Sequence, residues 1–163
     1  MASSLVRIAV ATLSLSAAGL VALVTHEGYT DTAVQPLPGD AWTVGFGTTG
    51  GVKPGDKITP PKALARALTD VQAFEGALKK CVTVPLSQAE YDEYLGFSYN
   101  VGSAAFCNST MVRKLNALDY AGACAEFGRW SMFQGKDCRN PANRCGGLVK
   151  RRAEAQAACL GAQ

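Results

Sequence analysis

Two carboxylates and a hydroxyl lie close together in the first third of the chain. Glu27 ends an uncharged run, and Asp40 and Thr43 follow in a segment punctuated by glycine. Breaking a glycosidic bond requires one carboxylic acid to protonate the departing oxygen, and a second group to orient water on the other face of the sugar. We expect Glu27 to be the acid, because the junction of an apolar helix with a polar loop shields it partly from water. Asp40 and Thr43 are the candidates for orienting the water.

His26, the one histidine of the sequence, indicates no second kind of chemistry. A metal site would need further ligands beside it, and a Ser-His-Asp triad would need a serine with a motif of its own. The sequence shows neither pattern, so we expect no metal and no cofactor. His26 is predicted to pack or to make a local hydrogen bond.

The composition and length of the chain limit which kinds of element can position these residues. The 163 residues, of which 48% are hydrophobic, suffice for one compact domain with a core. A net charge of +3 does not indicate nucleic-acid binding, but it favours approach to an anionic polymer such as a bacterial wall. Six cysteines without Cys-x-x-Cys spacing indicate disulfides formed outside the cytosol.

The uncharged run Ile8–Thr25 is the first element. It is slightly shorter than the ~20 residues of a bilayer span, and about half of it is Ala, Ser, Thr and Gly, so its hold on lipid is weak. Three interpretations fit: a cleaved signal peptide, a permanent anchor, and a segment that is inserted first and released later. We favour release, because cleavage after Ala22 would leave Glu27 close to a frayed terminus. Arg7 predicts that the N-terminus stays inside and the remainder is exported.

Helical periodicity dominates the rest of the chain. Thr59 and Pro60 are expected to begin a helix. The apolar face of this helix is predicted to consist of Leu64, Leu68, Val71, Phe74 and Leu78. Ser87–Glu90 forms a capping-box pattern at the start of a second helix that continues to Val101.

Two shorter helices are predicted further along the chain. Ser109 is expected to cap Met111–Leu118, and Asp119 to cap a helix from Tyr120 to about Arg129. Short helices joined by tight polar turns favour a mainly helical lobe.

Several of these segments resemble the phage-type lysozymes, or muramidases. The resemblance is strongest at Glu27–Gly28, Trp42–Gly47, Phe97–Gly102 and Gly147–Arg152. It implies an α+β, mainly helical fold with a small β-hairpin N-terminal lobe, a larger helical C-terminal lobe and a cleft between them. It also implies that residues 1–25 are a signal-anchor-release or signal segment and that residues 26–163 are the catalytic domain.

The resemblance implies an endolysin that hydrolyses the β-1,4 bond between N-acetylmuramic acid and N-acetylglucosamine in bacterial peptidoglycan. Such a monomer is exported to the host periplasm, tethered at first to the inner membrane and then released. The resemblance assigns substrate binding to Arg129 and Arg152, and the amide of Asn100 is a candidate to bind an N-acetyl group or to end its helix. Two alternatives stay open: a lytic transglycosylase, which needs one catalytic glutamate, and a peptidoglycan-binding protein that has lost hydrolysis.

The sequence departs from the family pattern at the second carboxylate. The family places an aspartate nine positions after the glutamate, where this chain has Pro36. A hairpin one residue longer would make Asp40 the substitute, and Asp31 is a second candidate. A third possibility is that no second carboxylate is essential.

The cysteine spacings suggest three disulfides among the pairings that six cysteines allow. A local closure is expected at Cys138–Cys145, and longer ties at Cys81–Cys107 and Cys124–Cys159. No cysteine lies in Ile8–Thr25, so a thiol of that segment cannot switch the protein by disulfide exchange.

Overall fold

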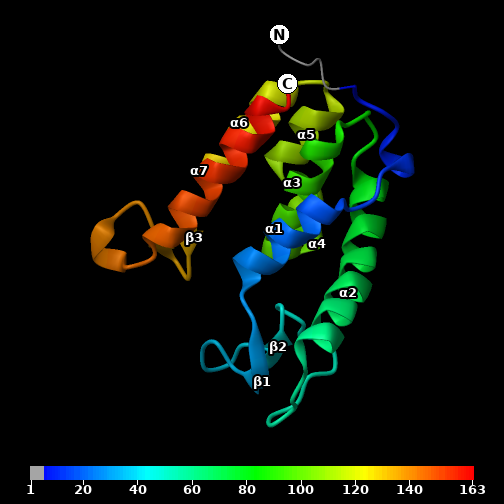
Figure 1. The fold of residues 1–163 in the computed structure, drawn as a ribbon. Coiled ribbons are helices and arrows are strands. Elements are labelled where there is room, and N and C mark those ends of the chain that lie inside the picture. Colours follow the sequence, from blue (N-terminus) through cyan, green and yellow to red (C-terminus); the bar gives the residue numbers. More distant parts are fainter. Residues whose placement is uncertain (1–5) are drawn as a thin grey trace. The chain divides into compact units, whose positions relative to one another are not determined.

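A computed structural model describes residues 6–163, which form two compact units (Figure 1). One unit, here the helical unit, combines Met1–Ser14, described from Val6 on, with Ala77–Gln163. The other, here the inserted unit, is the continuous stretch Leu15–Gly76. The chain therefore begins one unit, builds the second, and returns to complete the first.

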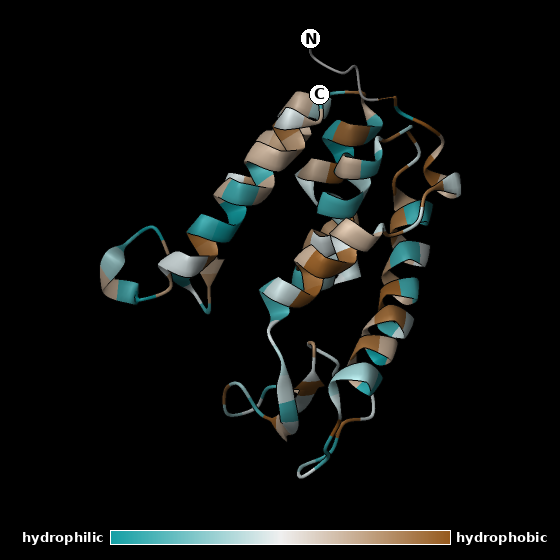
Figure 2. Ribbon diagram, viewed as in Figure 1, coloured by the Kyte–Doolittle hydropathy of each residue, from teal (hydrophilic) through white to brown (hydrophobic). Residues whose placement is uncertain are grey.

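The inserted unit consists of a helix, a two-stranded sheet and most of a long second helix. Helix α1 (Ala17–Glu27) begins at Ser16, whose side chain accepts a hydrogen bond from the Gly19 N–H. The antiparallel strands β1 (Thr30–Val34) and β2 (Thr43–Gly45) follow. Helix α2 (Pro60–Cys81) begins after Thr59, as predicted, and carries hydrophobic and hydrophilic residues along its length (Figure 2).

The predicted apolar face of α2 was wrong in its first turns. Leu64 and Leu68 are 38% and 43% exposed, whereas Ala63 and Ala67 are fully buried. The cause is the close approach of β2, because a Cβ atom added to Gly45 would lie 2.8 Å from the Cβ of Ala63. Only small side chains fit at this contact, so the leucines turn outward. Further along, Val71 and Leu78 are buried as expected.

The helical unit contains most of the helices. Its elements are η1 (Val10–Thr12), α3 (Gln88–Val101), α4 (Ser103–Cys107), α5 (Thr110–Asn116), α6 (Tyr120–Ala125), η2 (Glu126–Arg129), β3 (Met132–Phe133), β4 (Lys136–Asp137), η3 (Pro141–Asn143) and α7 (Gly146–Gly161). The predicted caps are confirmed: Ser87 and Glu90 form a capping box, and Ser109 and Asp119 accept hydrogen bonds from their helix N-termini. The prediction of a mainly helical α+β chain is therefore confirmed.

Aromatic side chains fill the core of the helical unit. Tyr94 and Phe127 are fully buried and stack with ring centres 5.7 Å apart, and Phe97 meets Phe127 edge-on at 5.1 Å. All three predicted disulfides are confirmed, and all lie in this unit: Cys81–Cys107, Cys124–Cys159 and Cys138–Cys145.

The uncharged run is folded in this structure. Ile8 and Leu86 exchange backbone hydrogen bonds of 2.9 and 3.0 Å. Val10 and Leu13 are buried in the helical unit, and Leu23 is buried in the inserted unit. No helix within residues 6–163 combines the length and apolar character needed to cross a membrane.

A fully buried carboxylate, that of Glu90, joins three parts of the helical unit. It accepts hydrogen bonds from Arg7 Nε at 2.9 Å and from Arg7 Nη2 at 2.7 Å. It also accepts one from the Ser87 N–H and one from Gln163 Nε2, both at 2.8 Å. The guanidinium of Arg7 lies 3.7 Å from the ring centre of Tyr120, and its hydrogen bond to Glu90 raises the pKa of Arg7. Both carboxylate oxygens of the buried Glu90 therefore accept hydrogen bonds.

Replacing Arg7 by alanine is expected to lower the free energy of unfolding by about 3 kcal/mol, because a buried charge loses its partner. Urea unfolding followed by circular dichroism measures the change. The matched control is Lys150→Ala, since Lys150 and Glu154 form an exposed pair at 3.9 Å, and it should cost no more than about 0.5 kcal/mol. Equal losses in both variants would contradict the role of the Arg7–Glu90 pair.

The tight contact of α2 with β2 gives a second prediction. Ala63→Leu should destabilise the chain by about 1–3 kcal/mol, since the larger side chain has no room against Gly45. Leu64→Ala, one position along, removes a partly exposed side chain and should change stability by less than about 1 kcal/mol. Urea unfolding separates the two, and a larger loss from Leu64→Ala would show that the leucine face is the buried one.

Candidate active site and substrate-binding residues

Glu27 is the last residue of α1, and its side chain is half-buried. The chain then turns at Gly28, whose φ of 70° is a conformation that glycine adopts without strain. The Gly28 N–H donates to the carbonyl oxygen of Val24 at 3.1 Å and closes the last turn of the helix. The carboxyl group is thus attached to a regular helix end rather than to a loose loop.

Asp40 and Thr43 lie in the β1–β2 connection and at the start of β2. Asp40 is exposed, and its backbone carbonyl oxygen accepts a 2.8 Å hydrogen bond from Gln35 Nε2. Thr43 is half-buried, and its hydroxyl donates to the carbonyl oxygen of Ala41 at 3.2 Å. Local hydrogen bonds therefore shape the turn that carries both residues.

Asp31 and Thr43 have different partners. Thr43 pairs with Val34 and Gly45 pairs with Thr30, and the register shifts between these two pairs, because four steps along β1 match two steps along β2. The backbone carbonyl of Asp31 instead accepts a hydrogen bond from the Ile58 N–H at 2.8 Å. Thr30 was missed by sequence reasoning: its Oγ1 is buried without a hydrogen-bond partner among the described residues. No motif marks such a hydroxyl, and only the strand pairing places Thr30 opposite Gly45.

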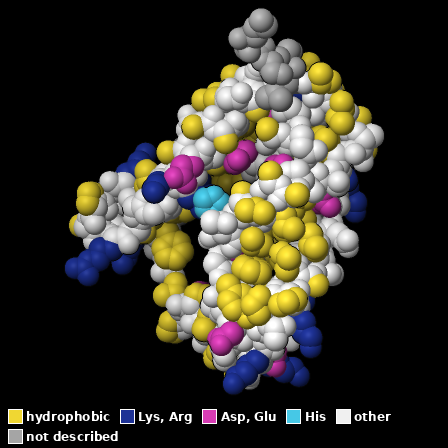
Figure 3. All heavy atoms as spheres, in the orientation of Figure 1, with side chains coloured by type: hydrophobic (Ala, Val, Ile, Leu, Met, Phe, Trp, Pro, Cys, Tyr) yellow, Lys and Arg dark blue, Asp and Glu magenta, His cyan; other side chains and the backbone are white. Residues whose placement is uncertain are grey.

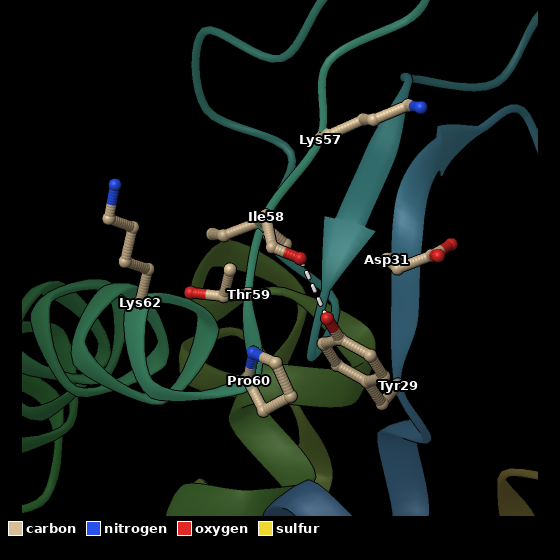
Figure 4. A pocket seen from close by; sticks show the side chains of 7 residues that line it. All are labelled: Tyr29, Asp31, Lys57, Ile58, Thr59, Pro60 and Lys62. Atoms are coloured by element: carbon tan, nitrogen blue, oxygen red, sulfur yellow. Dashed lines mark hydrogen bonds between the residues drawn. The ribbon is translucent and has the colours of Figure 1, made fainter.

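Asp31 instead lines a separate pocket of about 370 Å³ in the inserted unit (Figure 4). The Tyr29 hydroxyl closes one side by donating to the carbonyl oxygen of Ile58 at 2.7 Å. The pocket is lined by Tyr29, Asp31, Lys57, Ile58, Thr59, Pro60 and Lys62. Glu27, Asp40 and Thr43 are not among its lining residues.

In the helical unit, the structure brings Asn100 and Arg152 together. Arg152 is buried, and its Nη2 donates to Asn100 Oδ1 at 2.6 Å while its Nε donates to the carbonyl oxygen of Trp130 at 3.2 Å. Its guanidinium lies 4.8 Å from the ring centre of Phe97. Because arginine only donates, the bond fixes the amide of Asn100 with its oxygen toward Arg152 and leaves its NH₂ group as a donor.

The remaining candidates lie elsewhere. Arg129 is exposed, and its Nη1 lies 3.4 Å from Glu126 Oε1. It takes no part in the hydrogen bond between Asn100 and Arg152. His26 is exposed in the last turn of α1, so the packing alternative was wrong and the local hydrogen bond stays a prediction. No cluster of three or more His, Cys, Asp or Glu side chains suited to a metal occurs in the part of the chain that the structure describes.

These features define a class of protein: a mainly helical α+β fold whose small hairpin follows a helix that ends in glutamate. The chain belongs to the phage lysozyme family, whose sequence model matches residues 24–155. An endolysin of Acyrthosiphon pisum secondary endosymbiont phage 1 is 38% identical over 140 residues, covering 86% of this chain and 93% of that relative.

Two further similarities agree with this assignment. The SAR-endolysin of Pseudomonas phage phiKMV is 36% identical over 121 residues, covering 74% of this chain and 72% of that relative. The muramidase domain of SpmX from Asticaccaulis excentricus superimposes with a TM-score of 0.79 at 27% identity, covering 90% of this chain and 97% of that domain. The chain is thus a lysozyme-type glycoside hydrolase of the endolysin class, and the predicted lysozyme-like fold is confirmed.

Arg152→Lys is expected to raise KM for peptidoglycan about tenfold with a much smaller change in kcat, because a lost hydrogen bond to a binding group is worth roughly 1–1.5 kcal/mol. Lysine keeps the charge but cannot donate to Asn100 and Trp130 together. Asn100→Asp removes the NH₂ donor and should give the same KM effect. An unchanged KM in both variants, measured with soluble wall fragments, would exclude the pair from substrate binding.

Proposed function

We propose that Glu27 is the general acid with which this chain hydrolyses the β-1,4 bond between N-acetylmuramic acid and N-acetylglucosamine. The observation that carries the proposal is the position of Glu27 at the capped end of α1, half-buried and next to Gly28. A general acid must hold its proton close to the departing oxygen, and a side chain on a regular helix end keeps that geometry.

The hydroxyl groups of the hairpin are suited to holding the water that attacks the sugar. Thr43 and Thr30 both stand at paired positions of the β1–β2 hairpin, and the Thr30 hydroxyl has no partner among the described residues. We assign the orientation of water to Thr43, with Thr30 as a further donor. Asp40 is the candidate to take the proton of that water, whereas Asp31 lines the separate pocket.

The reaction then needs few steps. Glu27 gives its proton to the glycosidic oxygen as the bond to the anomeric carbon breaks. Water held at Thr43 adds its oxygen to that carbon, and its proton passes to Asp40. Separately, in the helical unit, the NH₂ group of Asn100, which Arg152 orients, is suited to donate to the carbonyl of an acetamido group of the wall polymer.

Glu27→Gln is expected to lower hydrolysis of purified peptidoglycan by at least about 100-fold, because the amide has nearly the same shape but carries no proton to give. The unfolding midpoint should stay close to that of the wild type. Asp40→Asn should cost less, and Asp31→Asn, which changes a residue of the separate pocket, is the matched control that should retain activity. Clearing of wall suspensions measures all three.

Three outcomes would overturn this assignment. Activity of Glu27→Gln above a few per cent would remove Glu27 as the acid. Products lacking one water, detected by mass spectrometry as anhydro-sugars, would identify a lytic transglycosylase instead of a hydrolase. Wall binding by the wild type without any clearing would identify a binding protein of the same fold.

We further propose that residues 1–25 first insert in the inner membrane and are later released intact into the periplasm. A SAR-endolysin among the relatives supports this proposal. The folded positions of Val10, Leu13 and Leu23 support it as well, because these side chains have a buried place available once they leave lipid. Cleavage after Ala22 would remove Arg7, the partner of the buried Glu90.

Ala11→Leu combined with Gly19→Leu should keep the chain in the membrane and reduce lysis severalfold, since each leucine strengthens the hold on lipid. Neither position precedes a signal-peptidase site by one or three residues, so cleavage stays possible. Ala11→Ser with Gly19→Ser is the control that should still be released. A soluble, lytic, shortened product from the leucine variant would identify a cleaved signal peptide.

A further inference from the structure

The segment Met132–Arg151, from β3 to the first turns of α7, concentrates positive charge. We call it the cationic segment. It has five basic residues and one acidic residue, a net charge of +4, whereas the whole chain carries +3, so the remainder carries −1. The basic residues are Lys136, Arg139, Arg144, Lys150 and Arg151. Figure 1 shows the segment projecting beyond the helices of its unit, and Figure 3 shows Lys and Arg side chains around this projection.

The backbone of the cationic segment is held in place by strand pairing, a disulfide and a side-chain hydrogen bond. Strands β3 and β4 pair through a two-residue turn, in which Gln134 and Gly135 have φ angles of 50° and 75°. The Cys138–Cys145 disulfide closes the following loop. Within that loop, Asn143 Nδ2 donates to the carbonyl oxygen of Asp137 at 2.8 Å. Its side chains are therefore presented from a fixed backbone.

Two large apolar side chains are exposed on the same hairpin. Met132 is 56% exposed and Phe133 is 50% exposed. Phe133 pairs across the hairpin with Lys136, so an aromatic ring and an ammonium group occupy one face. Leaving both apolar side chains in water is unfavourable, and a partner that covers them would gain hydrophobic burial.

The charges next to these side chains are not neutralised within the chain. Arg139 holds Asp137 by hydrogen bonds of 2.9 and 2.7 Å, which lower the pKa of Asp137 to about 2, so the one acidic group of the segment is already occupied. Lys136 and Arg144 form no ion pair with another described residue. Their charges are available to an external anion.

We propose that the cationic segment docks on the surface of an anionic lipid bilayer. Lipid phosphates would face Lys136 and Arg144, and the boundary of the acyl chains would receive Phe133 and Met132. An anionic glycan would satisfy the two cations but leave the apolar side chains in water, which is why we choose lipid. This contact is independent of residues 1–25 and would hold the released protein near the membrane.

The test uses the full oxidised chain and sedimentation with two kinds of vesicle: phosphatidylcholine alone, and equal parts of phosphatidylcholine and phosphatidylglycerol. Lys136→Gln with Arg144→Asn should weaken binding to the anionic vesicles by about tenfold or more and reduce its salt dependence. Phe133→Ser should weaken it by about fivefold. Binding to neutral vesicles should change little in the charge variant.

Matched controls lie outside the cationic segment. Lys53→Gln with Lys80→Gln removes two exposed charges, and Leu118→Asn removes an exposed leucine at a left-handed position that asparagine tolerates. All these variants should still hydrolyse soluble wall fragments in the absence of lipid, whereas Glu27→Gln should not. Failure of the lipid proposal is therefore distinct from failure of the catalytic proposal. Unchanged vesicle binding in the segment variants, or equal losses in the controls, would overturn the lipid proposal. So would segment variants that lose binding to isolated wall but keep binding to vesicles.

Discussion

The buried carboxylate of Glu90 is the constraint on which the helical unit depends. It belongs to the first turn of α3, yet its partners come from Arg7 near one end of the described chain and Gln163 at the other. A buried charge that lacks its partner costs several kcal/mol, so the unit is stable only when these three parts are assembled together. The capping box also makes Glu90 part of the start of α3, so a local helix signal and a long-range closure depend on one side chain.

This closure explains why the residues around the uncharged run are part of the fold. Arg7 and Ile8 are bonded to Glu90 and Leu86, and Leu13 is buried a few residues later. A run rich in Ala, Ser and Thr is apolar enough to enter lipid, yet small enough to form a short helix on a protein surface. A leucine-rich span would suit lipid but not a protein surface. The composition of the run therefore fits a segment that occupies lipid and protein in turn, as proposed for its release.

What could be predicted from the sequence was what local chemistry determines. The capping box at Ser87, the cap at Ser109 and the start of α2 at Pro60 depend on neighbours a few residues away, and all three were found. Leu64 and Leu68 were misplaced because helical periodicity reports apolar positions but not the close approach of Gly45 from another strand. Such a contact is invisible until the partner strand is known.

The candidate site divides in the same way. Glu27, Asp40 and Thr43 were proposed from residue type and resemblance, and Asn100 and Arg152 were named separately. The hydrogen bond between Asn100 and Arg152, which lie 52 positions apart in the sequence, became apparent only from the fold. Thr30 carries no motif, and its unpartnered hydroxyl became visible only through its pairing opposite Gly45. Long-range pairing, rather than composition, decides which of these groups can act together.

The separation of Arg7 from its partners also has a consequence for the order of events during synthesis. Glu90 follows Arg7 by 83 residues and Gln163 follows it by 156. A ribosome adding about 5–20 residues per second needs roughly 4–17 s to reach the first partner and roughly 8–31 s to reach the second. Until Leu86 and Glu90 have been made, Ile8 and Arg7 lack the partners that they bond to in the folded chain. Under the insertion proposed above, translation gives the membrane first access to this segment, because its partners in the folded chain have not yet been made.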